Sequence, residues 1–529
     1  MKRLRVSRRD VLLASGALVA TPPRLFCAED PALRAVRTRT ECIDRPLGLE
    51  VAQPRFSWAL ESAGHNVRQS AYRILVASDP GLLSAGRADL WDSGRVDSDR
   101  CFDVPYTGRM LQSGKRAWWC VQVWDQRHAL SAPSQPTWFE MGLLEPRDWR
   151  AQWLAIEGPE EIADRAAGLP WIWGEISPAG ARVQKFRFRC SLAATPAGAE
   201  LLVSAKDHLQ GVWVNGRALP VPAAARDSWG TLLRLPVDLV AGANVVCVAA
   251  SADTGGFFPP DGGAVAAVLK VTGAAGQVTR RTTGPDWRTS NAEAADWTQP
   301  DFDDHGWPQA GASKANTKCE PWVPQPAMLV RHEFNIPKPM SRARLYATAL
   351  GAYEARINGQ RVGEARLAPE ISVASDHVFY QCYDVTSLLR PGVNAIGAMI
   401  GDGWYASALA WRKERYALGP GPRRFLAQLA LDYNDGSGEV VATGPRWQMA
   451  ESAVRSSEIY NGEHFDARAE SVGWDVAGFD AGAWDACGVG ATPDIRLVAQ
   501  IDPPIRTTLI LPPSRILRPR PGIDRKSVV

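Results

Sequence analysis

Ile357-Asn358-Gly359-Gln360 opens the stretch that decides the fold class, and Gly401-Asp402-Gly403-Trp404-Tyr405 closes it. An apolar strand end enters Asn358-Gly359, and both of these turn residues tolerate the positive φ angles of a tight hairpin. The run 379–385 alternates with period two, and 395–400 begins another strand. The stretch therefore predicts a β-sandwich segment that delivers aromatic residues to a loop at one end.

Four markers of this stretch and of the segment that follows it recur earlier in the chain, in the same order. Val214-Asn215-Gly216-Arg217 matches the Asn-Gly turn, and the run 239–244 matches the turn 389–394. The other two pairs are Gly284-Pro285-Asp286-Trp287 with Gly444-Pro445-Arg446-Trp447, and Trp297, Phe302 and Trp307 with Trp474, Phe479 and Trp484. Self-similarity over so long a period predicts a duplicated domain with loop insertions.

Composition is that of an ordinary globular protein. The 529 residues are 45% hydrophobic and 22% charged, with a net charge of +3, and the length suggests about three domains. The 46 glycines, 39 prolines and 21 tryptophans fit many short strands joined by turns. The sequence shows no basic face with interleaved aromatic residues, so it gives no reason to expect nucleic acid as a partner. The nine cysteines form no Cys-x-x-Cys pair, which favours buried free thiols.

The N-terminus is predicted to be a twin-arginine export signal spanning 1–28. Arg8-Arg9 precedes an apolar run that ends near Ala20, and Thr21-Pro22-Pro23 breaks it. The apolar run is about ten residues long, too short for a membrane span of about 20 residues. We therefore expect a periplasmic or extracellular protein; a basic N-terminal arm is the alternative.

The predicted fold class is all-β, with three sandwiches in sequence. The range 32–145 is predicted to be a fibronectin type III or immunoglobulin-like sandwich, because short alternating strands are separated by turn residues. The ranges 146–325 and 326–496 are the first and second copies of a duplicated jelly-roll (galactose-binding-like) sandwich. The range 497–529 starts a further β region that is too short for a domain of its own.

The sequence contains no strong catalytic motif: His-Glu-x-x-His, Gly-x-Ser-x-Gly, a phosphate loop and a dinucleotide fingerprint are all absent. The densest polar cluster is 458–468, which contains Glu463, Asp466 and Arg468. Its paired carboxylates suit a glycosidase acid and base. A structural loop, in which the carboxylates pair with Arg468 or cap backbone amides, is the favoured interpretation.

Two further sites are hypotheses of the same kind. Asp402, Trp404 and Tyr405 suit a sugar, since aromatic rings stack on sugars and Asp402 accepts hydrogen bonds from hydroxyl groups. Packing of the aromatic residues against a neighbouring domain is the favoured interpretation. Loops of the first copy that are rich in aspartate oxygen atoms are also suited to binding Ca²⁺. Solvent-exposed turns that hold no metal are the favoured interpretation. The aspartates in such loops of the first copy are Asp207, Asp253 and Asp261. No cofactor is predicted, because no specific motif supports Ca²⁺.

Several stretches resemble the N-terminal part of bacterial α-L-rhamnosidases, glycoside hydrolase family 78. The resemblance covers nearly the whole chain after the signal. The stretches are Cys42-Ile43-Asp44-Arg45-Pro46-Leu47-Gly48-Leu49, Pro54-Arg55-Phe56-Ser57-Trp58, Leu90-Trp91-Asp92-Ser93-Gly94, Ile357-Asn358-Gly359, Gly401-Asp402-Gly403-Trp404-Tyr405, Tyr460-Asn461-Gly462-Glu463 and Asp466-Ala467-Arg468.

This resemblance implies an accessory role for the chain. In the family such sandwiches precede an (α/α)6 barrel, which hydrolyses terminal α-L-rhamnosyl bonds by inversion with a Glu general acid and a second carboxylate. The barrel's catalytic motif is not in this sequence, so no catalytic residue is carried over. The implied partners are a rhamnose-containing glycan or glycoside and the missing barrel of the same polypeptide. Some members have a Ca²⁺-dependent rhamnose-binding sandwich. The alternative functions are a secreted carbohydrate-binding protein without hydrolase activity and a purely structural spacer whose sandwiches only dock the barrel.

Overall fold

Strands dominate the fold, as the alternating runs predict. The computed structural model describes residues 33–158, 162–164, 167–174, 183–206, 208–222, 233–252, 263–313, 325–407, 409, 418–419, 421–460, 462–512, 514–520 and 523–527. Residues 1–28, predicted as an export signal, and Asp207, Asp253 and Asp261 lie outside this description. The described part of the chain divides into two units: residues 33–46, 51–111 and 115–140 form one, and the remaining described residues form the other.

The N-terminal unit is a two-sheet sandwich. One sheet has the strand order β1-β2-β5 and the other β4-β3-β6-β7. The bounds are β1 (Arg34–Thr40), β2 (Arg55–Glu61), β3 (Gln69–Ala77), α1 (Pro80–Ser84), β4 (Trp91–Asp92), β5 (Val104–Pro105), β6 (Arg116–Asp125) and β7 (Thr137–Glu140). The rings of Phe56 and Trp119 pack with centroids 4.4 Å apart, and both side chains are fully buried. Alternation along β6 thus places Trp119, Val121 and Val123 in the core.

The first jelly-roll sandwich has sheets of order β13-β12-β15-β10-β18 and β14-β11-β16-β9-β19, with β17 beside β16. Its bounds are β9 (Ile172–Trp173), β10 (Gln184–Leu192), β11 (Gly198–Ala205), β12 (His208–Val214), β13 (Arg217–Ala218), β14 (Leu233–Pro236), β15 (Gly242–Ser251), β16 (Val265–Thr272), β17 (Val278–Thr282), β18 (Trp287–Ser290) and β19 (Gly311–Ala312). Phe186, Leu201, Val246 and Leu269 belong to the core between the sheets.

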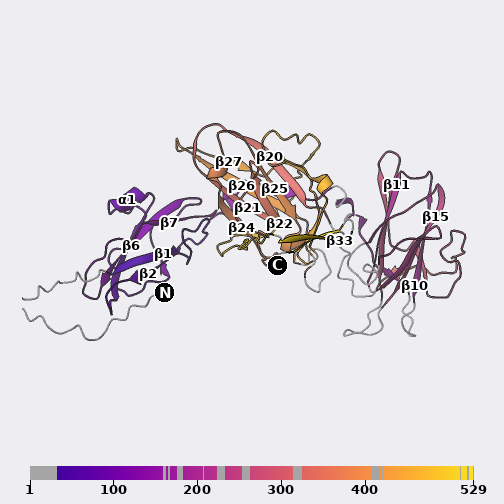
Figure 1. The fold of residues 1–529 in the computed structure, drawn as a ribbon, viewed down its shortest axis with the longest axis horizontal. Helices are drawn as coiled ribbons and strands as arrows, with labels where there is room; N and C mark the ends of the chain where they lie inside the picture. Colours follow the sequence, from indigo (N-terminus) through magenta and orange to yellow (C-terminus); the bar gives the residue numbers. More distant parts are fainter. Residues whose placement is uncertain are drawn as a thin grey trace, which may run out of the picture. The chain divides into compact units, whose positions relative to one another are not determined.

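The second sandwich repeats this architecture, with sheets β23-β22-β25-β20-β28-β31 and β27-β26-β21-β24-β32 (Figure 1). Its bounds are β20 (Met328–Ile336), β21 (Met340–Leu350), β22 (Ala352–Ile357), β23 (Gln360–Arg361), β24 (His377–Asp384), η2 (Thr386–Leu388), β25 (Gly392–Gly401), α4 (Gly403–Ala406), β26 (Arg424–Tyr433), β27 (Gly438–Ala442), β28 (Gln448–Glu451), β31 (Asp485–Ala486) and β32 (Arg496–Ala499). Two hairpins complete the described strands: β29 (Val454–Glu458) with β30 (Gly462–Phe465), followed by η3 (Ala467–Ala469), and β33 (Arg515–Arg520) with β34 (Ile523–Ser527).

The first sandwich is inserted into the second. The short strand β8 (Leu154–Ala155), which follows η1 (Pro146–Asp148), pairs with β26, and Leu154 also bridges Val489. In the first sandwich β9 takes the same place, between β16 and β19. The predicted range 146–325 for the first copy therefore contains a strand of the second, and the predicted range 497–529 overlaps β32, which pairs in parallel with β24.

The Asn-Gly turns confirm the duplication in atomic detail. Asn358 and Asn215 have φ angles of 49° and 50°, and each side-chain Oδ1 accepts a hydrogen bond from a β-strand amide, that of Ala395 at 3.0 Å and that of Val245 at 2.9 Å. Asn358 Nδ2 donates to Asn394 Oδ1 at 2.8 Å, and Asn215 donates to Asn244 in the same way. Each turn is thus hydrogen-bonded to the start of the neighbouring strand, β25 in the second copy and β15 in the first.

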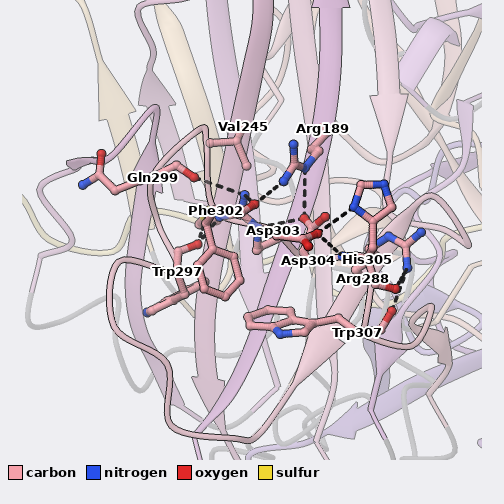
Figure 2. A network of polar contacts seen from close by, with 12 residues as sticks. Arg189, Val245, Arg288, Trp297, Gln299, Phe302, Asp303, Asp304, His305 and Trp307 are labelled. Atoms are coloured by element: carbon pink, nitrogen blue, oxygen red, sulfur yellow. Dashed lines mark hydrogen bonds and ion pairs between the residues drawn. The ribbon is translucent and has the colours of Figure 1, made fainter.

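The repeated Trp-Phe-Trp segment docks on a buried arginine in each copy. In the first sandwich, Arg187 of β10 donates to the carbonyl groups of Trp297 and Gln299 and lies over the Phe302 ring. Asp304 accepts from Arg187 Nε at 2.8 Å and from Arg189 Nε at 3.1 Å, and Figure 2 shows the contact between Asp304 and Arg189. In the second, the corresponding contacts are those of Arg331 with the carbonyl groups of Trp474 and Val476 and with the ring of Phe479.

Four of the described cysteines are buried thiols: Cys120, Cys190, Cys247 and Cys487. Burial raises the pKa of Cys247 to about 12, which keeps the thiol protonated. The prediction of buried thiols is wrong for Cys42, which is exposed in a turn that follows β1.

Candidate functional site

A groove on the second sandwich is the candidate functional site. Its volume is about 380 Å³, and it lies where β22, the end of β25 and the β29–β30 hairpin meet. Polar lining residues include Glu354, Glu458 and Glu463, and apolar ones include Met399 and Ile459. We call it the candidate groove. Three carboxylate-bearing residues beside an apolar wall give it both hydrogen-bond acceptors and a hydrophobic surface.

Two of the groove carboxylates have defined partners. Glu354 Oε1 lies 3.0 Å from Arg356 Nη1, and its Oε2 lies 2.8 Å from Arg361 Nε. Glu458 is buried, and its Oε2 accepts a hydrogen bond from the Tyr460 amide at 2.9 Å. Glu463 is exposed on the hairpin. The hairpin therefore presents one solvent-facing and one buried carboxylate to the groove.

Asp402 does not face the groove as a sugar acceptor, because it is fully buried. It pairs with Arg423 at 3.4 Å, and both side chains are 1% exposed. Arg423 also donates to the Pro326 carbonyl at 3.0 Å. The residue that follows, Gly403, has a φ angle of +54° and starts α4. The pair thus fixes the chain where β25 ends, which is a structural role.

Trp404 and Tyr405 pack inside the second sandwich. Tyr405 is buried among Trp153, Leu350 and Leu426, and burial raises its pKa to about 12. Trp404 is half-buried and lines, with Tyr405, a recess of about 20 Å³. A space of that size suits about one water molecule and is too small for a sugar ring. These two aromatic residues therefore pack within their own sandwich and not against a neighbouring domain.

Asp466 and Arg468 form a local pair at the end of the hairpin. Asp466 Oδ1 accepts from the Arg468 amide at 3.1 Å, and its carboxylate binds the guanidinium at 2.8 Å. These bonds lower the pKa of Asp466 to about 2, so the group stays ionised and does not serve as a general acid. Among the six predicted site residues, Glu463 alone lines the candidate groove.

Comparison with known proteins decides the family. Residues 338–509 match the alpha-L-rhamnosidase N-terminal domain, and residues 35–145 match the Rha78A-like, N-terminal immunoglobulin domain. An alpha-L-rhamnosidase of Streptomyces avermitilis is 39% identical over 510 residues, which are 93% of this chain and 48% of the relative. The crystal structure of the Streptomyces avermitilis enzyme complexed with L-rhamnose is similar with a TM-score of 0.72 at 38% identity, again over 93% and 48% of the two chains.

The chain belongs to the α-L-rhamnosidase family. A second α-L-rhamnosidase, from Formosa agariphila, is 23% identical over 481 residues, which are 90% of this chain and 36% of the relative. The crystal structure of the Aspergillus terreus rhamnosidase has a TM-score of 0.54 at 22% identity, and it supports the shared fold. The chain spans about half of the Streptomyces relative and about a third of the Formosa relative.

Within this family context, the candidate groove suits binding of a sugar. Carboxylate oxygens accept hydrogen bonds from sugar hydroxyls, and Met399 and Ile459 offer an apolar surface to C–H groups. The sequence cluster 458–468 located the hairpin. Glu354 and Met399 were missed, because on alternating strands they are indistinguishable from other surface positions.

Neither a metal site nor a membrane span is found among the described residues. No group of three or more His, Cys, Asp or Glu side chains is arranged there to hold an ion. In the same part of the chain, no helix is both long and apolar enough to cross a bilayer.

Proposed function

We propose that this chain is the accessory β-sandwich region of an enzyme that hydrolyses terminal α-L-rhamnosyl bonds with inversion. The observation that carries the proposal is the 39% identity to the Streptomyces α-L-rhamnosidase over nearly all of this chain but 48% of the relative. The (α/α)6 barrel expected from the family resemblance supplies the catalytic carboxylates. The sandwiches themselves are non-catalytic.

The groove carboxylates support a non-catalytic role. An inverting glycosidase needs two carboxyl groups about 6.5–9.5 Å apart, with one protonated and one free to activate water. Glu354 is held by arginine side chains, and Glu458 accepts a hydrogen bond from the Tyr460 amide, so both carboxylates already have structural partners. The purified chain is therefore expected to release no nitrophenol from p-nitrophenyl α-L-rhamnopyranoside, with the Streptomyces enzyme as positive control. Turnover above the buffer rate contradicts the proposal.

Carbohydrate binding by the candidate groove is the second candidate function. The mixed polar and apolar lining favours it. Isothermal titration with L-rhamnose measures it, and Glu463→Gln is expected to weaken binding about threefold to tenfold, because one charged acceptor becomes a neutral one. Glu470→Gln is the control, since Glu470 is exposed and does not line the groove. Equal affinities of the two variants contradict this assignment.

We also propose export by the twin-arginine route, on the basis of Arg8-Arg9 and the apolar run that follows. Replacing both residues by lysine is expected to retain the protein in the cytoplasm, because the pathway reads the arginine pair. Cell fractionation measures this, and undiminished export of the variant contradicts it.

A further inference from the structure

A second groove adjoins the candidate groove at Glu354. Its volume is also about 380 Å³, and its charged lining residues are Arg361, Glu364, Arg366 and Arg506. Glu354 lines the candidate groove, while its Oε2 atom contacts Arg361 at 2.8 Å and Arg366 at 3.3 Å. We call the second one the arginine groove. The two grooves therefore share one cluster of ion pairs.

Positive charge exceeds negative charge in this cluster. Glu354 also binds Arg356, at 3.0 Å, so a single carboxylate serves three guanidinium groups. Asp475 gives Arg356 a second partner at 2.5 Å. The four guanidinium groups are those of Arg356, Arg361, Arg366 and Arg506, and the three carboxylates are those of Glu354, Glu364 and Asp475. The guanidinium groups of this cluster therefore outnumber its carboxylates by one.

Arg506 is the group best placed to take a ligand. Its side chain is 62% exposed, and its contact with Glu364, itself 79% exposed, is 3.9 Å long. Exposed pairs of this length are weak and screened by salt. The backbone nevertheless holds Arg506 in place, because residue 506 forms a β-bridge with Ala365 and the Arg366 amide donates to Ile505 at 2.7 Å.

The neighbouring groups add donors suited to an anion. Arg366 Nη1 contacts Glu354, and its Nε donates to Thr507 Oγ1 at 3.2 Å, which holds the guanidinium plane at the groove wall. Thr508 lines the same groove. Guanidinium groups bind carboxylates and sulfates through paired N–H donors, and nearby hydroxyl groups donate further hydrogen bonds to the same anion.

We propose that the arginine groove binds the anionic group of an acidic oligosaccharide whose neighbouring deoxyhexose lies in the candidate groove. This inference rests on the proposed function, and it specifies the substrate class as a rhamnose-bearing glycan with a carboxylate or sulfate substituent. The apolar wall then contacts the deoxysugar, and Arg366 and Arg506 bind the charge. Neutral rhamnosides occupy the candidate groove alone.

The test is isothermal titration of the whole chain with a glucuronosyl-rhamnose disaccharide and with the same disaccharide reduced to glucosyl-rhamnose. A rhamnose sulfate monosaccharide forms a third arm, which separates a sulfate ester from a uronate as the source of the charge. The variants are Arg506→Gln and the double variant Arg366→Gln with Arg506→Gln. Arg217→Gln is the matched control, since Arg217 is 77% exposed in an ion pair of the first sandwich.

The acidic disaccharide is expected to bind at least tenfold more tightly than the reduced one, and this difference shrinks at 0.5 M salt. Arg506→Gln alone is expected to remove most of the preference for the acidic disaccharide. If the double variant fails to fold, this single variant still tests the inference. Equal affinity for both disaccharides, or a preference unchanged in Arg506→Gln, overturns the inference while leaving rhamnose binding intact. Absence of binding by every acidic probe also overturns it, whereas the non-catalytic role of this chain is tested separately by the nitrophenyl assay.

Discussion

Asp304 shows how a single side chain holds the end of a sandwich. It is 2% exposed and binds Arg187, whose side chain is fully buried. Asp304→Asn leaves the Arg187 charge buried without its carboxylate, which is expected to cost about 3–5 kcal/mol. Hydrogen exchange of the β10 and β15 amides measures the loss as a lower opening free energy. Asp303→Asn is the control, because Asp303 pairs with His305 at the surface; equal effects of the two substitutions contradict the prediction.

Asp304 also makes the stability of the first sandwich depend on pH in the acidic range. Burial alone disfavours the ionised carboxyl, but hydrogen bonds from Arg187 and Arg189 outweigh it and lower the pKa of Asp304 below its usual value of 3.8. A lowered folded pKa contributes stability that is present above about pH 4 and is lost as the pH falls through the folded pKa. Protection of β10 is therefore expected to fall below pH 4 in the wild type and to fall less steeply in Asp304→Asn.

At the scale of the element, Gly403 controls how β25 ends. Its φ angle is +54°, and an added Cβ would lie 2.5 Å from the Ala352 Cβ and 2.6 Å from the Ala352 amide nitrogen. Gly403→Ala is expected to cost more than the about 1–2 kcal/mol of left-handed strain alone. Gly436→Ala is the control for strain without a clash, since φ is +83° there and nothing lies within 4 Å. Thermal unfolding compares the two, and equal losses contradict the prediction.

Elements also show how far the sequence predicts this fold. The Asn-Gly turns and the Trp-Phe-Trp spacing predicted a duplication because each marker repeats a chemical requirement: a positive φ angle at the turn, and rings that pack on a buried arginine. Trp404 and Tyr405 were harder to place, since an aromatic residue after a strand suits a sugar or a core equally. A turn of helix at 403–406 directs Tyr405 inward, and the strand pattern contains no signal for it.

At the scale of the whole molecule, the insertion of one sandwich into the other makes β8 indispensable to the second. Trp153, Leu154 and Ile156 are buried there. Replacing 159–324 by a flexible linker is expected to leave the second sandwich folded. Replacing 153–156 by Gly and Ser in that variant is expected to cost more than about 4 kcal/mol, because three large side chains leave the core. Denaturant unfolding measures both variants, and equal midpoints contradict the prediction.

Sequence alone did not predict this insertion. β8 has two residues, too few for a periodic pattern, and its partner strand lies on the far side of an entire domain. The duplicated markers all fall within the parts of each copy that follow the first strand. The predicted boundary between the two copies therefore assigned β8 to the first copy, which follows it directly in sequence.

The order of synthesis gives β8 a further significance. Ala155 leaves the ribosome 269 residues before its partner Arg424, since 424 − 155 = 269. At about 5–20 residues per second the strand waits roughly 13–54 s for that partner. During this interval the intervening sandwich acquires all of its own described strands and is able to close first. Of the two sandwiches, the inserted one is therefore able to complete its strand pairing first, and the apolar side chains beside β8 stay without their β26 partner until that strand is synthesised.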